Sequence, residues 1–213
     1  MSQSKNVAIL IFNDVEVLDF AGPFEVFSVT GRSDGSNPFN VYTVAETAEP
    51  VFARNYFSVN PRYTLENCPK PDILLVPGGG GYTPDGKPYG TRREMHNQIL
   101  LEWIKQSAQH AELLLSVCTG ALILATAGLL NGLSATTHHG AIEQLRELAP
   151  HTQIRPSDRV VDNGSVILSG GISAGIDMSL YVVAKLLGQS QALETATYME
   201  YDWRHENLPI LSV

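Results

Sequence analysis

The stretch Glu112-Leu-Leu-Leu-Ser-Val-Cys118-Thr119-Gly120-Ala-Leu-Ile-Leu-Ala-Thr-Ala-Gly128 decides the fold of this chain. An apolar run of strand length ends at one thiol, and a helix-like run begins directly after it. A residue at such a sharp turn projects its side chain out of both elements, which is the geometry of a nucleophile elbow. Backbone N–H groups at a helix start favour negative charge, so we expect the Cys118 thiol to ionise easily. A buried structural cysteine is the alternative interpretation, and the stretch by itself leaves both open.

Further apolar runs extend this alternation of strand and helix along the chain. Strands are predicted at residues 7–12, 40–45 and 72–76, and a hairpin at 159–168, where Asn163-Gly164 supplies the two positive-φ positions of a tight turn. Helices are predicted at 23–30, 92–109, 141–148, 174–187 and 190–201. Strands alternating with helices predict an α/β fold with a mainly parallel sheet and helices on both faces. No repeat or linker interrupts the pattern, so residues 1–213 are expected to form a single domain.

Composition and charge argue against several classes of protein. The 213 residues carry a formal net charge of −8, which argues against a nucleic-acid partner, because binding phosphates needs a basic face. No apolar run approaches the roughly 20 residues that span a bilayer. Two cysteines and a polar N-terminus favour a reduced, cytoplasmic location, without a disulfide and without a structural zinc site.

Three candidate segments follow predicted strands: Asp19, the glycine run Gly78–Gly81, and Cys118-Thr119. Sites in open α/β sheets lie beyond the carboxyl ends of the strands, so we expect these segments to meet there. Each segment also has a structural interpretation. Asp19 could cap a helix that starts near Pro23. The glycines could form only a turn or a phosphate cradle, although no Lys-Ser or Lys-Thr follows them. His138 and His139 could be ordinary polar residues at a strand end.

The motifs themselves resemble those of one family. Residues 116–138 resemble the central signature of the ThiJ/PfpI superfamily, which is related to class I glutamine amidotransferases. Residues 19–27, 76–79 and 170–177 resemble its other blocks, and the similarity runs from about Val7 to Tyr201. The resemblance implies a flavodoxin-like three-layer sandwich.

Within the superfamily, the chain is most similar to the isocyanide hydratase branch and to the sensor domains of AraC-type regulators. Thr119 stands where proteases and amidases of the wider group usually have His, and its pairing with Asp19 and Cys118 is hydratase-like. The resemblance implies a cysteine-dependent hydro-lyase that converts an isocyanide to an N-substituted formamide. In that scheme Cys118 attacks the terminal carbon, Asp19 supplies the proton, and Thr119 positions Asp19 or water. No metal and no organic cofactor are implied, and relatives are commonly homodimers.

The N–H groups of Gly79 and Thr119 are expected to form an oxyanion-hole-like pocket, with Gly80 and His138 nearby as substrate-binding residues. The rivals are a glyoxalase- or deglycase-like enzyme, an amidase with His138 as its base, and a ligand- or redox-sensing domain. The chain departs from the family pattern in three places. These are an apparent insertion at 82–90, interpreted as a surface loop beside the site, His139 in place of an aromatic residue, and the tail 203–213.

Overall fold

A computed structural model describes residues 4–33 and 35–209 of the chain. Its centre is a seven-stranded sheet with the strand order β12-β13-β9-β6-β1-β2-β5. Every neighbouring pair in this sheet is parallel except β12 with β13, which is the predicted hairpin. The bounds are β1 (Lys5–Leu10), β2 (Phe39–Ala45), β5 (Tyr63–Thr64), β6 (Ile73–Val76), β9 (Leu113–Val117), β12 (Val160–Asp162) and β13 (Val166–Ser169).

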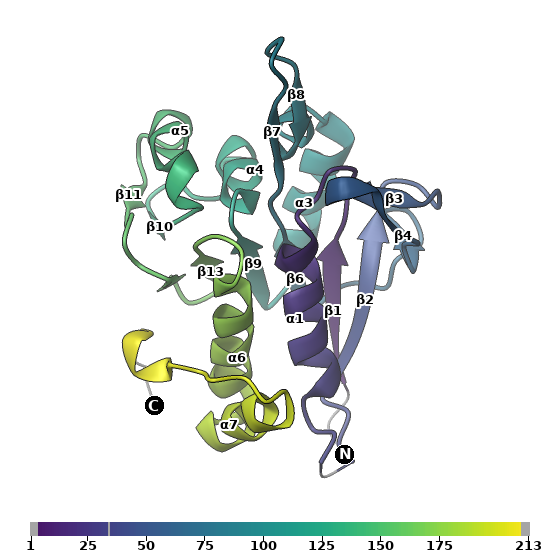
Figure 1. The fold of residues 1–213 in the computed structure, drawn as a ribbon, viewed down its shortest axis with the longest axis vertical. Helices are drawn as coiled ribbons and strands as arrows, with labels where there is room; N and C mark the ends of the chain where they lie inside the picture. Colours follow the sequence, from purple (N-terminus) through teal and green to yellow (C-terminus); the bar gives the residue numbers. More distant parts are fainter. Residues whose placement is uncertain (1–3, 34, 210–213) are drawn as a thin grey trace.

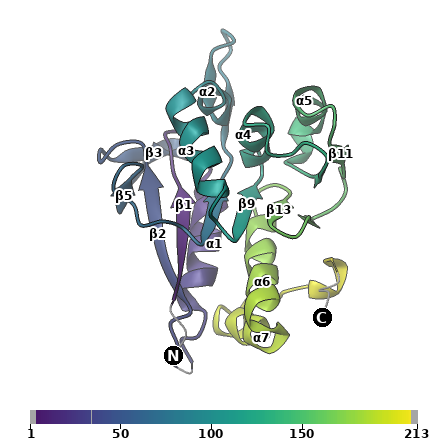
Figure 2. The same cartoon turned by 180° about the vertical axis from the view of Figure 1, so that it is seen from behind.

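Helices cover both faces of the sheet. Figure 1 shows α1 (Val17–Val29), α6 (Ala174–Leu187) and α7 (Gln189–Tyr198) on one side, and Figure 2 shows α3 (Gln98–Ala108) on the other. Covering both faces explains why every residue of β6 and β9 is buried and why these strands are almost continuously apolar. The predicted three-layer α/β sandwich is therefore confirmed.

The remaining elements are short, and several gather beyond the carboxyl ends of the central strands (Figure 1). They are β3 (Val51–Ala53), β4 (Phe57–Val59), β7 (Gly80–Tyr82), β8 (Pro88–Gly90), α2 (Thr91–Glu94), α4 (Gly120–Thr126), β10 (Ser134–Ala135), α5 (Ile142–Leu148) and β11 (Gln153–Ile154), with 3₁₀ turns η1 (Arg54–Tyr56), η2 (His139–Ala141) and η3 (His205–Asn207). Within the described ranges, no helix has both the length and the apolar character needed to cross a membrane. The last four residues of the tail 203–213 lie outside the described residues.

The first helix begins six residues earlier than predicted. Its N-cap is Glu16, so Pro23 lies inside α1 and Asp19 lies in its first turn. A helix start near Pro23 is expected because proline is tolerated in a first turn, but α1 continues through Pro23 without the hydrogen bond to the carbonyl four residues before it. The interpretation of Asp19 as a cap of a helix at Pro23 is therefore wrong.

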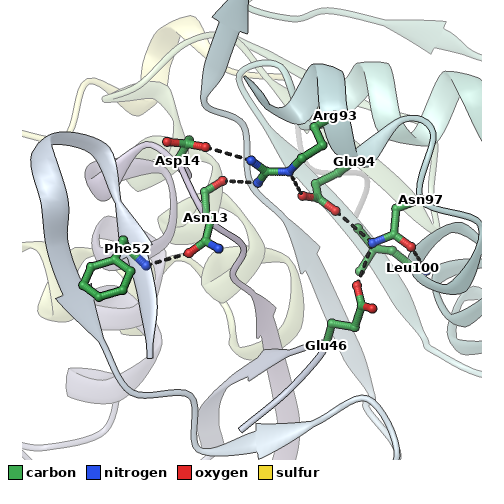
Figure 3. A network of polar contacts seen from close by, with 8 residues as sticks. All are labelled: Asn13, Asp14, Glu46, Phe52, Arg93, Glu94, Asn97 and Leu100. Atoms are coloured by element: carbon green, nitrogen blue, oxygen red, sulfur yellow. Dashed lines mark hydrogen bonds and ion pairs between the residues drawn. The ribbon is translucent and has the colours of Figure 1, made fainter. Parts of the chain in front are cut away.

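The single helix predicted at 92–109 is two helices, because Asn97 interrupts it. The Asn97 side chain caps α3 by accepting a hydrogen bond from Leu100 N at 3.2 Å. Its amide nitrogen donates to Glu94 and Glu46, as Figure 3 shows. Because of this interruption at Asn97, α2 is a separate short helix beyond the carboxyl ends of the strands.

Two turn predictions also need correction. Residues 82–90 lie mostly at the surface, as expected, but they belong to a β-hairpin in which Gly80 pairs with Gly90 and Tyr82 with Pro88. Pro and Gly are unfavourable inside a central strand, but a two-stranded hairpin tolerates them where no further strand pairs. In the β12–β13 turn only Gly164 of the Asn163-Gly164 pair has positive φ, at 86°, and the Asn163 side chain is hydrogen-bonded to the backbone of Ser134.

Candidate active site

Cys118 occupies a sharp turn between β9 and α4. Its φ is +57°, a left-handed conformation that costs energy in any residue other than glycine. The surroundings hold it there, because Cys118 N donates to Gly170 O at 3.1 Å and Thr137 Oγ1 donates to Cys118 O at 2.7 Å. The side chain is 5% exposed. The predicted elbow geometry is therefore present, at the carboxyl end of a central strand.

Asp19 lies in the first turn of α1 and is completely buried. Gly78 N–H donates to its Oδ2 at 3.0 Å, while Oδ1 accepts no hydrogen bond of ordinary geometry from any described residue. Burial raises the pKa of the carboxyl from 3.8 to about 7, against the lowering effect of the Cys118 thiol and of Gly78 N–H. The Cys118 thiol is thus the neighbour that interacts with the carboxyl besides Gly78 N–H, and Oδ1 has no other hydrogen-bond partner among the described residues.

The thiol does not have the low pKa expected from a helix start. Burial first, and the Asp19 carboxylate second, raise the pKa of Cys118 to about 12, although N–H groups of Thr119 and Ile172 oppose them. Because α4 is only seven residues long, its N-terminal dipole is outweighed by removal of the thiol from water. The expectation of an easily ionised isolated thiol is contradicted.

Together the two groups behave as one titrating pair. With one pKa at about 7 and the other at about 12, the pair holds a single proton between these values. Either the carboxyl or the sulfur can carry that proton, so thiolate beside neutral Asp19 is one of the two arrangements of this state.

Thr119 joins the glycine loop to α2. Its Oγ1 accepts from Gly79 N at 3.0 Å and lies 3.1 Å from Thr91 Oγ1, and no described contact links it to Asp19. The Gly79 N–H predicted for an oxyanion hole is thus engaged by Thr119, whereas Thr119 N–H interacts with the Cys118 sulfur. Gly80 belongs to the β7–β8 hairpin, and its glycine is explained by the close approach of Tyr89 and Gly90.

Glycine is required where the loops after β6 and β9 meet. A Cβ on Gly78 would lie 2.5 Å from both N and Oγ1 of Thr119 and 3.0 Å from Asp19 Oδ2. A Cβ on Gly120 would overlap the carbonyl oxygen of Val76. Any side chain at these two positions would separate Asp19, Thr119 and the elbow.

His138 lies beside the elbow and lines a hollow of about 340 Å³ with Thr137, Gly171 and Ile172. Its Nδ1 accepts from Gly140 N at 3.1 Å, which leaves the proton of the neutral ring on Nε2. Burial, then His139 and Arg92, lower the pKa of the ring. His138 is therefore a hydrogen-bond donor at neutral pH, and its basic nitrogen is occupied by backbone.

A larger hollow of about 520 Å³ lies on the other side of α2 and does not include Cys118. Figure 3 shows the network along its wall, where Arg93 donates to Asp14, to the carbonyl of Asn13 and to Glu94. Because these charges are paired with one another, the network fixes α2 against the loop after β1. Among the described residues, no group of three or more His, Cys, Asp or Glu side chains could hold a metal ion.

Three residues near the elbow were missed from sequence: Thr91, Arg92 and Ile172. Thr91 and Arg92 were noted only as the end of the 82–90 segment, and no spacing rule joins residue 91 to residue 119. Ile172 has φ +30°, and its N–H acts on the Cys118 sulfur through the backbone, which residue type does not reveal. The sequence offered one signal for Thr91 and Arg92: they are polar, and they directly follow the 82–90 segment beside the glycine loop.

Comparisons with known proteins place the chain among relatives of one family. The model of the DJ-1/PfpI family matches residues 5–185. An isonitrile hydratase of Pseudomonas putida is 35% identical over 196 residues, covering 92% of this chain and 78% of that protein. The HTH-type transcriptional regulator CdhR of Pseudomonas aeruginosa is 28% identical, and the match covers 91% of this chain but only 54% of the regulator. A THiJ/PfpI family protein from Pseudomonas syringae has a solved structure with a TM-score of 0.82 and 29% identity, over 94% of this chain and 76% of that one.

Proposed function

The chain belongs to the DJ-1/PfpI family, and on that premise we propose that it is a cysteine-dependent hydro-lyase that hydrates an isocyanide to an N-substituted formamide. The observation that carries the proposal is the buried carboxyl of Asp19 beside the Cys118 thiol, since burial raises the pKa of this carboxyl and so keeps a transferable proton next to the sulfur. The similarity to an isonitrile hydratase supports the same reaction.

The first step uses the thiolate form of the pair. The Cys118 sulfur forms a bond to the terminal carbon of the isocyanide, and the Asp19 carboxyl transfers its proton to that carbon. The product is a thioimidate, with sulfur bonded to a CH=N carbon and Asp19 left as carboxylate. General acid help of this kind contributes about 10²–10⁴-fold in rate.

The second step uses water. The Asp19 carboxylate takes a proton from a water molecule, whose oxygen bonds to the thioimidate carbon, and the nitrogen receives that proton. The carbon–sulfur bond then breaks, the formamide leaves, and the remaining hydroxyl proton returns to the pair. The sum is isocyanide plus water to formamide, and the pair regains its one proton.

The backbone around the sulfur assists both steps. N–H groups of Thr119 and Ile172 stabilise the thiolate, which leaves when the carbon–sulfur bond breaks. Gly78 N–H holds Asp19 Oδ2, so that Oδ1 is the oxygen that gives and takes protons. The amidase alternative is disfavoured, because Nδ1 of His138 is engaged by Gly140 N–H and the pKa of the ring is lowered.

A sensing role is the second candidate, and the similarity to transcriptional regulators favours it. The chain spans about half the length of those regulators. In that role the same pocket would bind a small molecule without turning it over.

One experiment separates these candidates. The protein is incubated with a simple alkyl isocyanide in ¹⁸O-labelled water, and the formamide is followed by mass spectrometry. We expect labelled formamide from the unaltered protein and none above background from Cys118→Ala. Turnover of methylglyoxal in place of isocyanide would indicate the glyoxalase- or deglycase-like alternative, and saturable binding without turnover would indicate a sensor.

A further inference from the structure

Arg92 is an unusual cation in this acidic chain. It lies in α2, next to Thr91, whose hydroxyl is 3.1 Å from Thr119 Oγ1, and it is half-buried. Most arginines in the described ranges form ion pairs with carboxylates. The described residues provide no such partner for Arg92, Arg32, Arg62 or Arg155, and the last three are exposed. Arg92 is therefore the partly buried member of this group.

The hydrogen bonds of Arg92 leave part of its donor capacity unused. Nε and Nη2 both donate to one oxygen, Gln144 Oε1, at 3.1 and 2.9 Å. Gln144 belongs to α5 and donates in turn to the Tyr82 hydroxyl of the hairpin, at 3.4 Å. A guanidinium carries five N–H donors, and no described residue accepts from Nη1 of Arg92. A neutral amide orients the cation without cancelling its charge.

Arg92 also lies near the groups proposed to react. Cys118 has a Coulombic interaction with Arg92, and Arg92 in turn contributes to the lowered pKa of His138. The cation thus lies within electrostatic range of both the nucleophile and the donor ring of the neighbouring hollow. A chain with a net charge of −8 repels anions in general, so an uncompensated guanidinium at this point is a local exception.

We propose that Arg92 binds a carboxylate on the substrate, so that this site acts on small molecules carrying both an electrophilic carbon and a carboxylate group. The proposal rests on the proposed function of the same site, and for that reaction the substrate class is an isocyanide bearing a carboxylate. A hydrogen bond from a guanidinium N–H to a carboxylate is charge-assisted, and it is roughly twice as strong as one between neutral groups. The carboxylate would be held by Nη1 while Gln144 keeps the guanidinium plane in place.

The test uses two alkylating probes that differ only in charge. Iodoacetate and iodoacetamide both form a bond from sulfur to carbon with loss of iodide, and neither reaction depends on hydratase activity. The rates at Cys118 and Cys68 are measured in the same sample by peptide mapping. We expect the iodoacetate-to-iodoacetamide ratio at Cys118 to exceed that at Cys68 by roughly tenfold, the effect of one charge-assisted hydrogen bond. Equal ratios at the two thiols would overturn the proposal without any variant.

Variants then assign the preference to Arg92. Arg92→Gln should lower the ratio at Cys118 roughly tenfold, Arg92→Lys should retain part of it, and Arg146→Gln, an exposed arginine of α5 paired with Glu143, should leave it unchanged. An equal fall in both rates in Arg92→Gln would show that Arg92 only stabilises the thiolate, and would also overturn the proposal. A preference for iodoacetate in a protein that hydrates no isocyanide would retain the anion site and refute the proposed reaction.

Discussion

The two cysteines of this chain are the same residue in two different settings. Both are free thiols, and burial raises the pKa of each. Cys68 lies before β6, in a turn where its N–H donates to Thr64 O at 3.0 Å. Cys118 lies after β9, at the opposite ends of the parallel strands, beside a buried carboxyl and two N–H groups. The comparison teaches that the setting differs more than the thiol itself, and on the proposed function Cys118 owes its reactivity to the neighbouring carboxyl rather than to a low pKa of its own.

The largest expected effect is on turnover in the two cysteine-to-alanine variants. Cys118→Ala should lower isocyanide hydration to the uncatalysed background, because no other thiol adjoins Asp19. Cys68→Ala should retain kcat/KM within about twofold, since Cys68 is half-buried at the opposite ends of the strands, away from the site. Formamide production is measured for both variants. A strong loss of activity in Cys68→Ala would contradict the expected difference between the two cysteines.

Asp19→Asn tests the shared proton directly. An amide keeps an acceptor for Gly78 N–H but cannot transfer a proton, so kcat should fall by about 10²–10⁴-fold. Steady-state kinetics of isocyanide hydration give the result. Full activity in this variant would show that the carboxyl is structural.

The pH dependence should separate the two thiols. Below about pH 7 the pair gains a second proton and loses its thiolate form, so kcat/KM should fall about tenfold per pH unit on that side. Alkylation of Cys118 by iodoacetamide should rise through the same pH range, whereas alkylation of Cys68 should rise only at higher pH, because burial raises its pKa and no carboxyl adjoins it. The same pH profile of alkylation at both thiols would show that Asp19 does not share a proton with Cys118.

The same carboxyl should destabilise the fold. Because its folded pKa is raised, the neutral acid is favoured, and stability present below pH 4 is lost as pH rises through about 7. A shift from 3.8 to about 7 corresponds to at most about 4 kcal/mol. At pH 8, Asp19→Asn should therefore unfold at higher urea concentration than the unaltered protein, and the gain should shrink at pH 5. A variant less stable at both pH values would refute this.

The smallest effect concerns the β7–β8 hairpin. Replacing residues 83–87 with two glycines shortens an exposed tip, so the free energy of unfolding should change by less than about 1 kcal/mol. Substrate preference should change, because Tyr82 contacts Gln144 near the site. Urea unfolding and KM for isocyanides of different size check both points, and a large loss of stability would show that the hairpin is structural.

Pattern reasoning predicted the sheet well, because buried parallel strands such as β6 and β9 are continuous apolar runs. It failed at two single residues, because Asn97 interrupts the expected helix at 92–109, whereas Pro23 lies inside α1 without ending it. For the site, the sequence predicted that Asp19 and Cys118 would meet, since both follow central strands. It could not predict the raised pKa of the thiol or the contact between Thr91 and Thr119, because burial and distant side-chain contacts depend on the assembled fold.

The close approach at Gly78 and Gly120 has a consequence for how this protein can change. Neither position accepts a Cβ, so a substitution at Gly78 or Gly120 would disturb the pair rather than introduce a new specificity. The β7–β8 hairpin, Arg92 and α5, here called the rim, carry no such restriction at their exposed positions. Proteins descended from this chain could therefore diverge in what they accept while retaining the same chemistry, and a directed-evolution library limited to the rim would reach new substrates with fewer unfolded members.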